Sequence, residues 1–205
     1  MLAKGPVSMI NLLRSGAAGA VFAAMALAST ASAAETATAT AQADVVQAFT
    51  VSKDADLDFG AIVVNPAGGA VTMSAAGALT CGSGFVCHGG SSAAAFSVDG
   101  GTIGKRLLID LPDTTAGALK MLHTSHTGAA NATLEIELNN FTTNAALDAA
   151  SGKHFVTIAD AGVAGGGAAT GVGGAGFAVG GSAVFDGSEV EGVYSVNFDV
   201  TVDYE

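Results

Sequence analysis

The sequence Gly192-Val-Tyr-Ser-Val-Asn-Phe-Asp-Val-Thr-Val-Asp-Tyr-Glu205 decides the fold class of this chain. From Tyr194 onward apolar and polar residues alternate at every position, so an extended chain has one apolar and one polar face. The apolar face consists of Tyr194, Val196, Phe198, Val200, Val202 and Tyr204. This pattern predicts a half-buried β-strand that begins at Gly192. We call it the closing strand and expect its apolar residues in the core.

Shorter β-rich stretches, separated by Gly, Asp, Ser or Pro, precede the closing strand. They are residues 45–51, 57–64, 70–74, 94–98, 106–111, 119–122, 133–141, 155–159 and 177–185. A sustained helical period is absent from the sequence. About nine or ten short strands in one domain (residues 48–205) predict an all-β fold, namely an Ig-like or pilin-like antiparallel β-sandwich.

Residues 1–33 have the pattern of a secretory signal peptide. Lys4 and Arg14 precede an apolar run from Ala17 to Ala28, and the small residues Ala31-Ser32-Ala33 follow. The run has about a dozen residues, fewer than the roughly twenty that a membrane span needs. We therefore expect an exported mature chain without a membrane span, located in the periplasm, on the cell surface or outside the cell.

The charge of the mature chain argues against some classes of partner. Loss of Lys4 and Arg14 leaves five of the seven basic residues against 18 acidic ones, a net charge of −13. Nucleic acids and anionic lipids favour clusters of Lys and Arg. We therefore expect no nucleic-acid partner.

Residues 34–47, which we call the leader, also alternate. Thr36, Thr38, Thr40 and Gln42 lie on one face of an extended chain, and Ala37, Ala39, Ala41 and Ala43 on the other. The period of two and the β-branched threonines favour an extended conformation over a helix. The leader is either the first strand of its own sandwich or an N-terminal extension.

The two cysteines predict a disulfide bond. Cys81 and Cys87 are the only cysteines in the chain, and disulfides persist in exported proteins. Such a bond closes a small loop, so it restrains that loop rather than holding the fold together. The alternative, a metal site that adds His88, lacks an evident fourth ligand.

Candidate catalytic and metal-binding patterns are incomplete. His123 and His126 are close in sequence, but neither an HExxH motif nor a neighbouring cysteine accompanies them. Asp54, Asp56 and Asp58 resemble the start of a calcium loop, which also needs a glycine and a late glutamate. We therefore expect no catalytic, cofactor-binding or metal-binding residues and no cofactor. Among the functions considered, an exported hydrolase is therefore the least favoured hypothesis.

A stretch of mostly Gly and Ala runs from Gly162 to Gly176. Gly weakens strand interiors, so this composition predicts a surface loop. A loop of this length is also a candidate contact surface.

Several short motifs, taken in order, resemble an exported bacterial family known as domain of unknown function 4402. They are Leu57-x-Phe59-Gly60-x-Ile62, Gly68-Gly69-x-Val71-Thr72, Ala95-Phe96-Ser97-Val98-x-Gly100, Val179-Gly180-Gly181-Ser182-Ala183-Val184 and Gly192-x-Tyr194-Ser195-x-x-Phe198-x-Val200-Thr201-Val202-x-Tyr204. The resemblance extends from about Thr36 to Glu205. It implies an exported β-domain and no known activity.

The closing strand alone is also similar to the C-terminal strand of chaperone–usher pilins, with Gly192 fourteenth from the end and Tyr204 penultimate. That resemblance implies self-association, or a periplasmic chaperone and usher, as partners.

Two functions follow as expectations. The first is a non-catalytic structural or adhesive surface protein, such as a fimbria-like subunit. The second is a self-complete secreted β-sandwich that acts as a binding or envelope-coat module.

Overall fold

The computed structural model describes residues 35–160 and 171–205. The predicted signal peptide and residues 162–170 of the predicted Gly-rich loop lie outside the described residues. Residues 44–205 form one compact unit, separate from residues 1–43. Residues 35–48 belong to no helix or strand, and each of them is exposed.

In the described part of the 44–205 unit, the regular elements are β-strands and a single turn of 3-10 helix, η1 (Ala132–Leu134), joined by turns and loops. Its largest sheet has the order β1-β6-β13-β9-β8-β14, and β3, β4 and β12 join it beside this path. The strands of this large sheet are β1 (Phe49–Ala55), β3 (Gly69–Met73), β4 (Leu79–Cys81), β6 (Ala94–Gly100), β8 (Leu119–His123), β9 (Glu135–Thr143), β12 (Ala159–Asp160), β13 (Gly173–Phe185) and β14 (Tyr194–Ser195).

A small sheet and a two-stranded ribbon complete the fold. The small sheet has the order β10-β11-β7-β15, and β2 pairs with β5 in the ribbon. Their strands are β2 (Ala61–Val63), β5 (Val86–His88), β7 (Arg106–Asp110), β10 (Ala146–Leu147), β11 (His154–Thr157) and β15 (Thr201–Tyr204). All pairings are antiparallel. The predicted all-β class is confirmed, with more strands than predicted.

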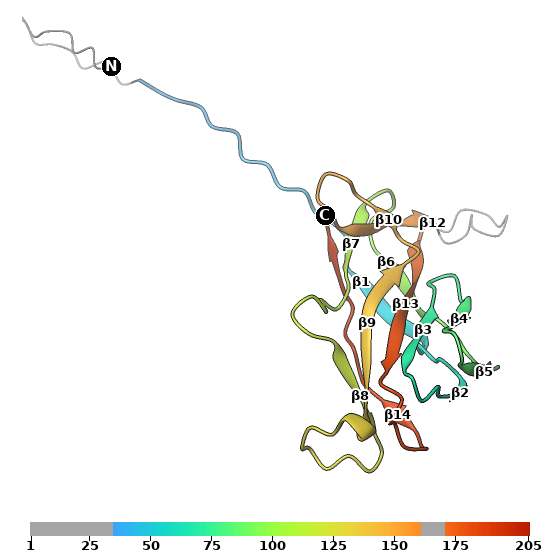
Figure 1. Ribbon diagram of the computed structural model, residues 1–205. Coiled ribbons are helices and arrows are strands. Elements are labelled where there is room, and N and C mark those ends of the chain that lie inside the picture. Colours follow the sequence, from blue (N-terminus) through green and yellow to red (C-terminus); the bar gives the residue numbers. More distant parts are fainter. Residues whose placement is uncertain (1–34, 161–170) are drawn as a thin grey trace, which may run out of the picture. The chain divides into compact units, whose positions relative to one another are not determined.

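The long strand β13 organises the large sheet (Figure 1). On one side it pairs with β6 through Gly174–Val179 and then with β3 through Gly181–Phe185. On the other side it pairs with β12 and β9. Gly180 lies where β13 changes partner, and a Cβ there would be 2.2 Å from the main-chain oxygen of Met73. Only glycine allows this close approach.

Two clusters of buried side chains form the core. The first joins Phe59, Val71, Met73, Phe85, Ile136, Leu138, Ala183 and Phe185. The second lies between the large and small sheets and joins Ala94, Val98, Leu107, Ile109, Ile158, Phe177 and Val179. β13 contributes to both clusters, so one strand spans the whole core.

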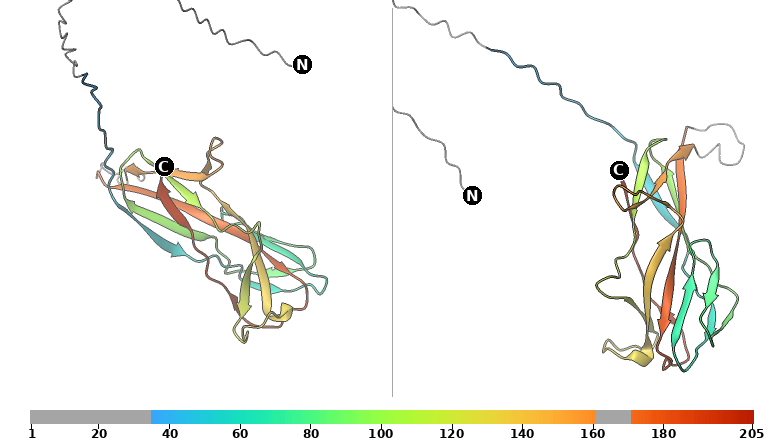
Figure 2. Two further views of the ribbon diagram at one scale, coloured as in Figure 1. Left: turned by 90° about the vertical axis from the view of Figure 1, so that its left-hand side faces the viewer. Right: turned by 45° about the horizontal axis from the view of Figure 1, so that its top comes forward.

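The closing strand passes from the large sheet to the small sheet. Its start, β14, pairs with β8, and its end, β15, pairs with β7. Figures 1 and 2 show this red segment running along the domain to the end where β1 begins. Residues 196–200 belong to no ladder, so the prediction of one continuous paired strand is wrong here.

The break has a cause in the partner segment. Between the pairs Ser195↔Leu122 and Thr201↔Asp110 the closing strand has five residues, whereas its partner has eleven. The surplus forms the connection between β7 and β8, which includes Pro112. Proline has no N–H to donate to a ladder. The closing strand and the segment between β7 and β8 therefore separate over residues 196–200.

Two further predictions need correction. The first strand of the domain begins at Phe49 rather than at Val45, because its ladder with β6 begins at the pair Phe49↔Gly100. The predicted surface loop is wrong for residues 173–176, which form the start of β13. A Cβ on Gly173 would be 2.5 Å from Ile158 Cγ2, so tight packing requires glycine inside this strand.

Candidate functional site: the open edge of the closing strand

The six apolar side chains of the closing strand are half-buried, and the polar residues between them are exposed. Tyr194 and Val196 pack against the first core cluster. Phe198, Val200, Val202 and Tyr204 pack against the second. The closing strand therefore connects the two clusters, but none of its side chains is fully buried.

One edge of the closing strand is open. β15 pairs with β7, and the main-chain N–H of Glu205 donates to the oxygen of Arg106 at 3.1 Å. In an antiparallel ladder, alternate residues direct their main-chain groups to opposite sides. The main chains of Val200, Val202 and Tyr204 therefore face away from β7, and no described residue bonds to them.

The core is also incompletely covered beside this edge. Val51 of β1 pairs with the buried Val98, so the two side chains lie on the same face of the large sheet. Val51 is nevertheless 41% exposed, whereas Val98 is 1% exposed. The small sheet ends at β15, which leaves the core-side face of β1 partly uncovered. A strand placed beside β15 would cover it.

Tyr204 fastens the far end of the closing strand. Its hydroxyl donates to the main-chain oxygen of Gln47 at 2.6 Å and accepts from the N–H of Thr102 at 2.9 Å. Its ring meets that of Phe49 edge to face, with centroids 5.2 Å apart. Residues 44–48, which we call the leader root, therefore lie at the Tyr204 end of the domain.

Tyr194 fastens the near end. Its hydroxyl lies 2.9 Å from the main-chain oxygen of Thr133 and 2.8 Å from that of Val190, and its one hydrogen has both oxygens as acceptors within reach. Burial is the main reason that the pKa of Tyr194 is raised. The ring also contacts His123, with centroids 5.0 Å apart.

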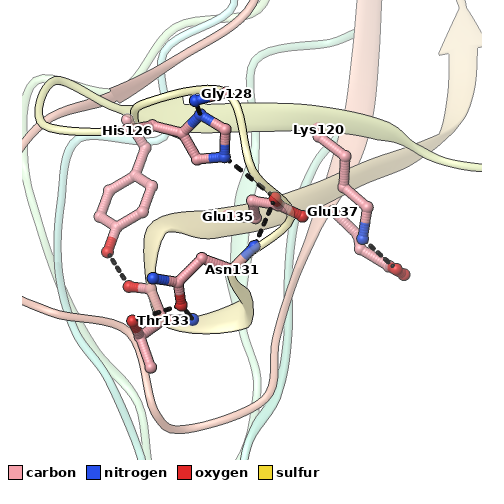
Figure 3. A network of polar contacts seen from close by, with 8 residues as sticks. Lys120, His126, Gly128, Asn131, Thr133, Glu135 and Glu137 are labelled. Atoms are coloured by element: carbon pink, nitrogen blue, oxygen red, sulfur yellow. Dashed lines mark hydrogen bonds and ion pairs between the residues drawn. The ribbon is translucent and has the colours of Figure 1, made fainter.

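A polar network holds the turn beside Tyr194 (Figure 3). Glu135 accepts from the main-chain N–H of Asn131 at 2.9 Å and contacts His126 Nε2 at 3.1 Å. The side chains of His126 and Glu135 are only 8% and 13% exposed. The Asn131 N–H, followed by the His126 contact, lowers the pKa of Glu135. The sequence carried no signal for this pair.

The predicted disulfide bond between Cys81 and Cys87 is present. Cys87 also pairs with Ile62 across the β2–β5 ribbon, and Cys81 pairs with Val71 across β3 and β4. The bond therefore ties the ribbon to the large sheet. Sequence patterns missed β4 and β5, because each has only three residues.

The other candidate residues do not converge. His123 contacts Ser125, whereas His126 contacts Glu135. Asp54 accepts from Ser97, Asp56 pairs with Lys53, and Asp58 accepts from the N–H of Gly60. Among residues 35–160 and 171–205, no cluster of His, Cys, Asp or Glu has an arrangement that would hold a metal ion.

Within the described part of the chain, no helix has the length and apolar character to cross a bilayer.

Comparison with known proteins gives one match. A family model described as "Domain of unknown function (DUF4402)" matches residues 49–204. No curated protein and no solved structure matches the chain.

Proposed function

The chain belongs to the family of domain of unknown function DUF4402, and from this premise we propose that it is an exported, non-catalytic structural subunit that assembles with other chains at a bacterial surface. The observation that carries this proposal is the open edge of the closing strand. An edge with free main-chain groups and a partly uncovered core beside it accepts an added strand.

The leader is a segment that could form the added strand. Its described residues form no helix or strand and are exposed. Residues 36–43 are uncharged and alternate between Thr or Gln and Ala. A strand with this alternation presents a small apolar face to the core and a polar face to solvent.

The small size of the alanines has a cost and a benefit. Leu in place of Ala would bury three more carbons, about 2 kcal/mol per position. However, Phe198, Val202 and Tyr204 of the closing strand already pack against the second core cluster, so an added strand need supply only part of the apolar cover. Small leader residues suit an edge of this kind, and the main-chain hydrogen bonds supply the rest of the stabilisation.

A periplasmic chaperone and an outer-membrane usher are the partners that this proposal implies before assembly. A chaperone strand on the same edge would protect it from premature association. Genes for these two proteins beside the gene for this chain would support the proposal.

A second candidate function is a self-complete binding or envelope-coat module. It is favoured by the ladders of β14 and β15, which attach both ends of the closing strand to the domain without a partner. In that case the leader serves as a tether only.

The deciding experiment is assembly of the mature chain with and without residues 34–45. We expect SDS-resistant multimers of the full mature chain and monomers of the deletion variant. Two double variants provide a matched comparison. Ala39→Asp with Ala41→Asp places charge on the apolar face of the leader, and Thr38→Asp with Thr40→Asp places it on the polar face. Only the first double variant should abolish multimers. A strictly monomeric mature chain would favour the self-complete module.

A further inference from the structure

We infer that the open edge of the closing strand receives the leader of a second copy of this chain in the antiparallel direction. We place Ala37 opposite Val202 and Ala43 opposite Val196, because this register lays the uncharged residues 37–43 along residues 196–202 with both apolar faces toward the core. This inference rests on the proposed function and adds the direction, the register and the exclusion of the chain's own leader. Direction and exclusion follow from the position of the leader root.

The leader root is fixed at the Tyr204 end of the open edge. Lys105 Nζ lies 2.5 Å from Asp44 Oδ2, the N–H of Gln47 donates to Thr102 Oγ1 at 2.8 Å, and Tyr204 binds the oxygen of Gln47. The N–H of Gly101 also donates to the oxygen of Ala48 at 3.0 Å. Four contacts therefore anchor the leader root. A leader that folded back onto its own closing strand would have to bend these five residues.

A leader that returned onto its own domain would have the wrong direction. Residue numbers in the leader increase toward the root, and those of the closing strand increase toward Tyr204, which lies at the root. The two segments would therefore run parallel. Parallel pairing is slightly less stable per residue than the antiparallel pairing found throughout this domain. The reversal would also break contacts of the root.

A leader from a second copy can pair in the antiparallel direction and leaves the contacts of the leader root intact. In the antiparallel direction its root reaches the Tyr194 end of the acceptor, so the second domain lies beyond that end. The Tyr204 end stays free for the acceptor's own leader root. Parallel entry would bring two leader roots to the same end. Antiparallel entry therefore gives a head-to-tail chain of copies, an open assembly with one type of contact.

The edge of the large sheet formed by β1 is a poorer acceptor than the open edge of the closing strand. β1 carries Lys53, and its register with β6 shifts between Lys53 and Ala55. An edge lysine and a bulge both discourage strand addition. The closing strand has no Lys or Arg in Gly192–Glu205. The side chains therefore favour strand addition at the closing strand over strand addition at β1.

Thiol cross-linking between two singly substituted chains tests the direction. Mature chains carrying Val196→Cys or Val202→Cys are mixed with chains carrying Ala37→Cys or Ala43→Cys and treated with a short bis-maleimide. Cys81 and Cys87 do not react, because they are bonded to each other. Six residues of strand span about 20 Å, so the two directions give separate patterns.

We expect cross-linked dimers from Val202→Cys with Ala37→Cys and from Val196→Cys with Ala43→Cys. The crossed combinations should give at least about tenfold less product, since about 20 Å separates their thiols. Thr38→Cys is the control for the leader's other face and should react poorly with both.

Three results would overturn the inference. The first is a reversed pattern, in which Val202→Cys cross-links to Ala43→Cys and Val196→Cys to Ala37→Cys. The second is an equal amount of cross-linked dimer from all four combinations, or no dimer from any of them. The third is an internal cross-link without dimers in one chain that carries both Ala43→Cys and Val202→Cys. The proposed function is judged separately by the deletion of residues 34–45: multimers that need the leader but show none of the expected cross-links would keep the function and reject the site.

Discussion

A Cβ atom on Gly192 would lie 1.8 Å from Nε2 of His123, so the first residue of the closing strand is glycine because an imidazole occupies the neighbouring space. Gly192 also has a φ of 154°, a conformation that other residues rarely adopt. The ring of His123 in turn contacts Tyr194. The start of the closing strand is therefore packed around one histidine.

Gly192→Ala should destabilise the domain by about 1–3 kcal/mol, because the added methyl group forces His123 to move. The measurement is urea unfolding at neutral pH. Gly89→Ala is the control, since a Cβ there meets no atom within 4 Å. Equal losses in the two variants would show that His123 is not the cause.

Phe198→Ala should cost about 2–3 kcal/mol, at the low end for a large core truncation because the side chain is only half-buried. Its ring lies 5.0 Å from that of Phe141, so the substitution also removes an aromatic contact between the closing strand and β9. Asp199→Ala, on the exposed face, should change the unfolding free energy by less than about 0.5 kcal/mol. Similar losses from both would mean that the faces are misassigned.

Acid should weaken the turn that Glu135 holds. Because the pKa of Glu135 is lower in the folded chain than its ordinary value of 4.5, the carboxylate stabilises the fold above that pH. This stabilisation is lost as the pH falls through the lowered value. The urea midpoint should therefore fall between pH 5 and pH 3 by a smaller amount in Glu135→Gln than in the wild type. Glu137→Gln, at the exposed ion pair with Lys120, is the control for the loss of a carboxylate elsewhere on β9. An equal change in the two variants would mean that the contacts of Glu135 are not the cause.

Loss of the disulfide bond should lower the unfolding free energy by about 2–3 kcal/mol, as expected for a small loop. The variant is Cys81→Ser with Cys87→Ser, and the comparison is the wild type with and without reductant. Near-ultraviolet circular dichroism should show a folded domain in each case. Complete unfolding would mean that the bond holds the fold, rather than the β2–β5 ribbon alone.

The sequence was sufficient where the decisive information is local. The alternation from Tyr194 to Tyr204 assigns each side chain to a face, because the side chains of a strand point to opposite sides in turn. The spacing of Cys81 and Cys87 is equally local. The all-β class follows from the same kind of pattern, repeated in many short stretches.

Features that depend on distant residues were not predictable. The break at residues 196–200 depends on the length of the connection between β7 and β8, which lies far away in the sequence. The start of β13 was hidden because Gly173 disfavours a strand by itself, although packing against Ile158 requires it. The contact of His126 with Glu135 depends on how the turn between them folds, and the spacing of the two residues in the sequence does not predict it.

The bond between Tyr204 and Gln47 also determines how the domain would carry tension. In a head-to-tail chain each domain is pulled at its leader root and along its closing strand. Force at the root reaches the Tyr204 hydroxyl bond before it reaches the ladder between β1 and β6. The β1–β6 ladder would then be loaded in shear, so that its hydrogen bonds resist the force at the same time. Tyr204 is thus one of the contacts that bear load before the ladder of β1 and β6, after the ion pair of Asp44 with Lys105. Tyr204→Phe should lower the force at which a single domain begins to yield.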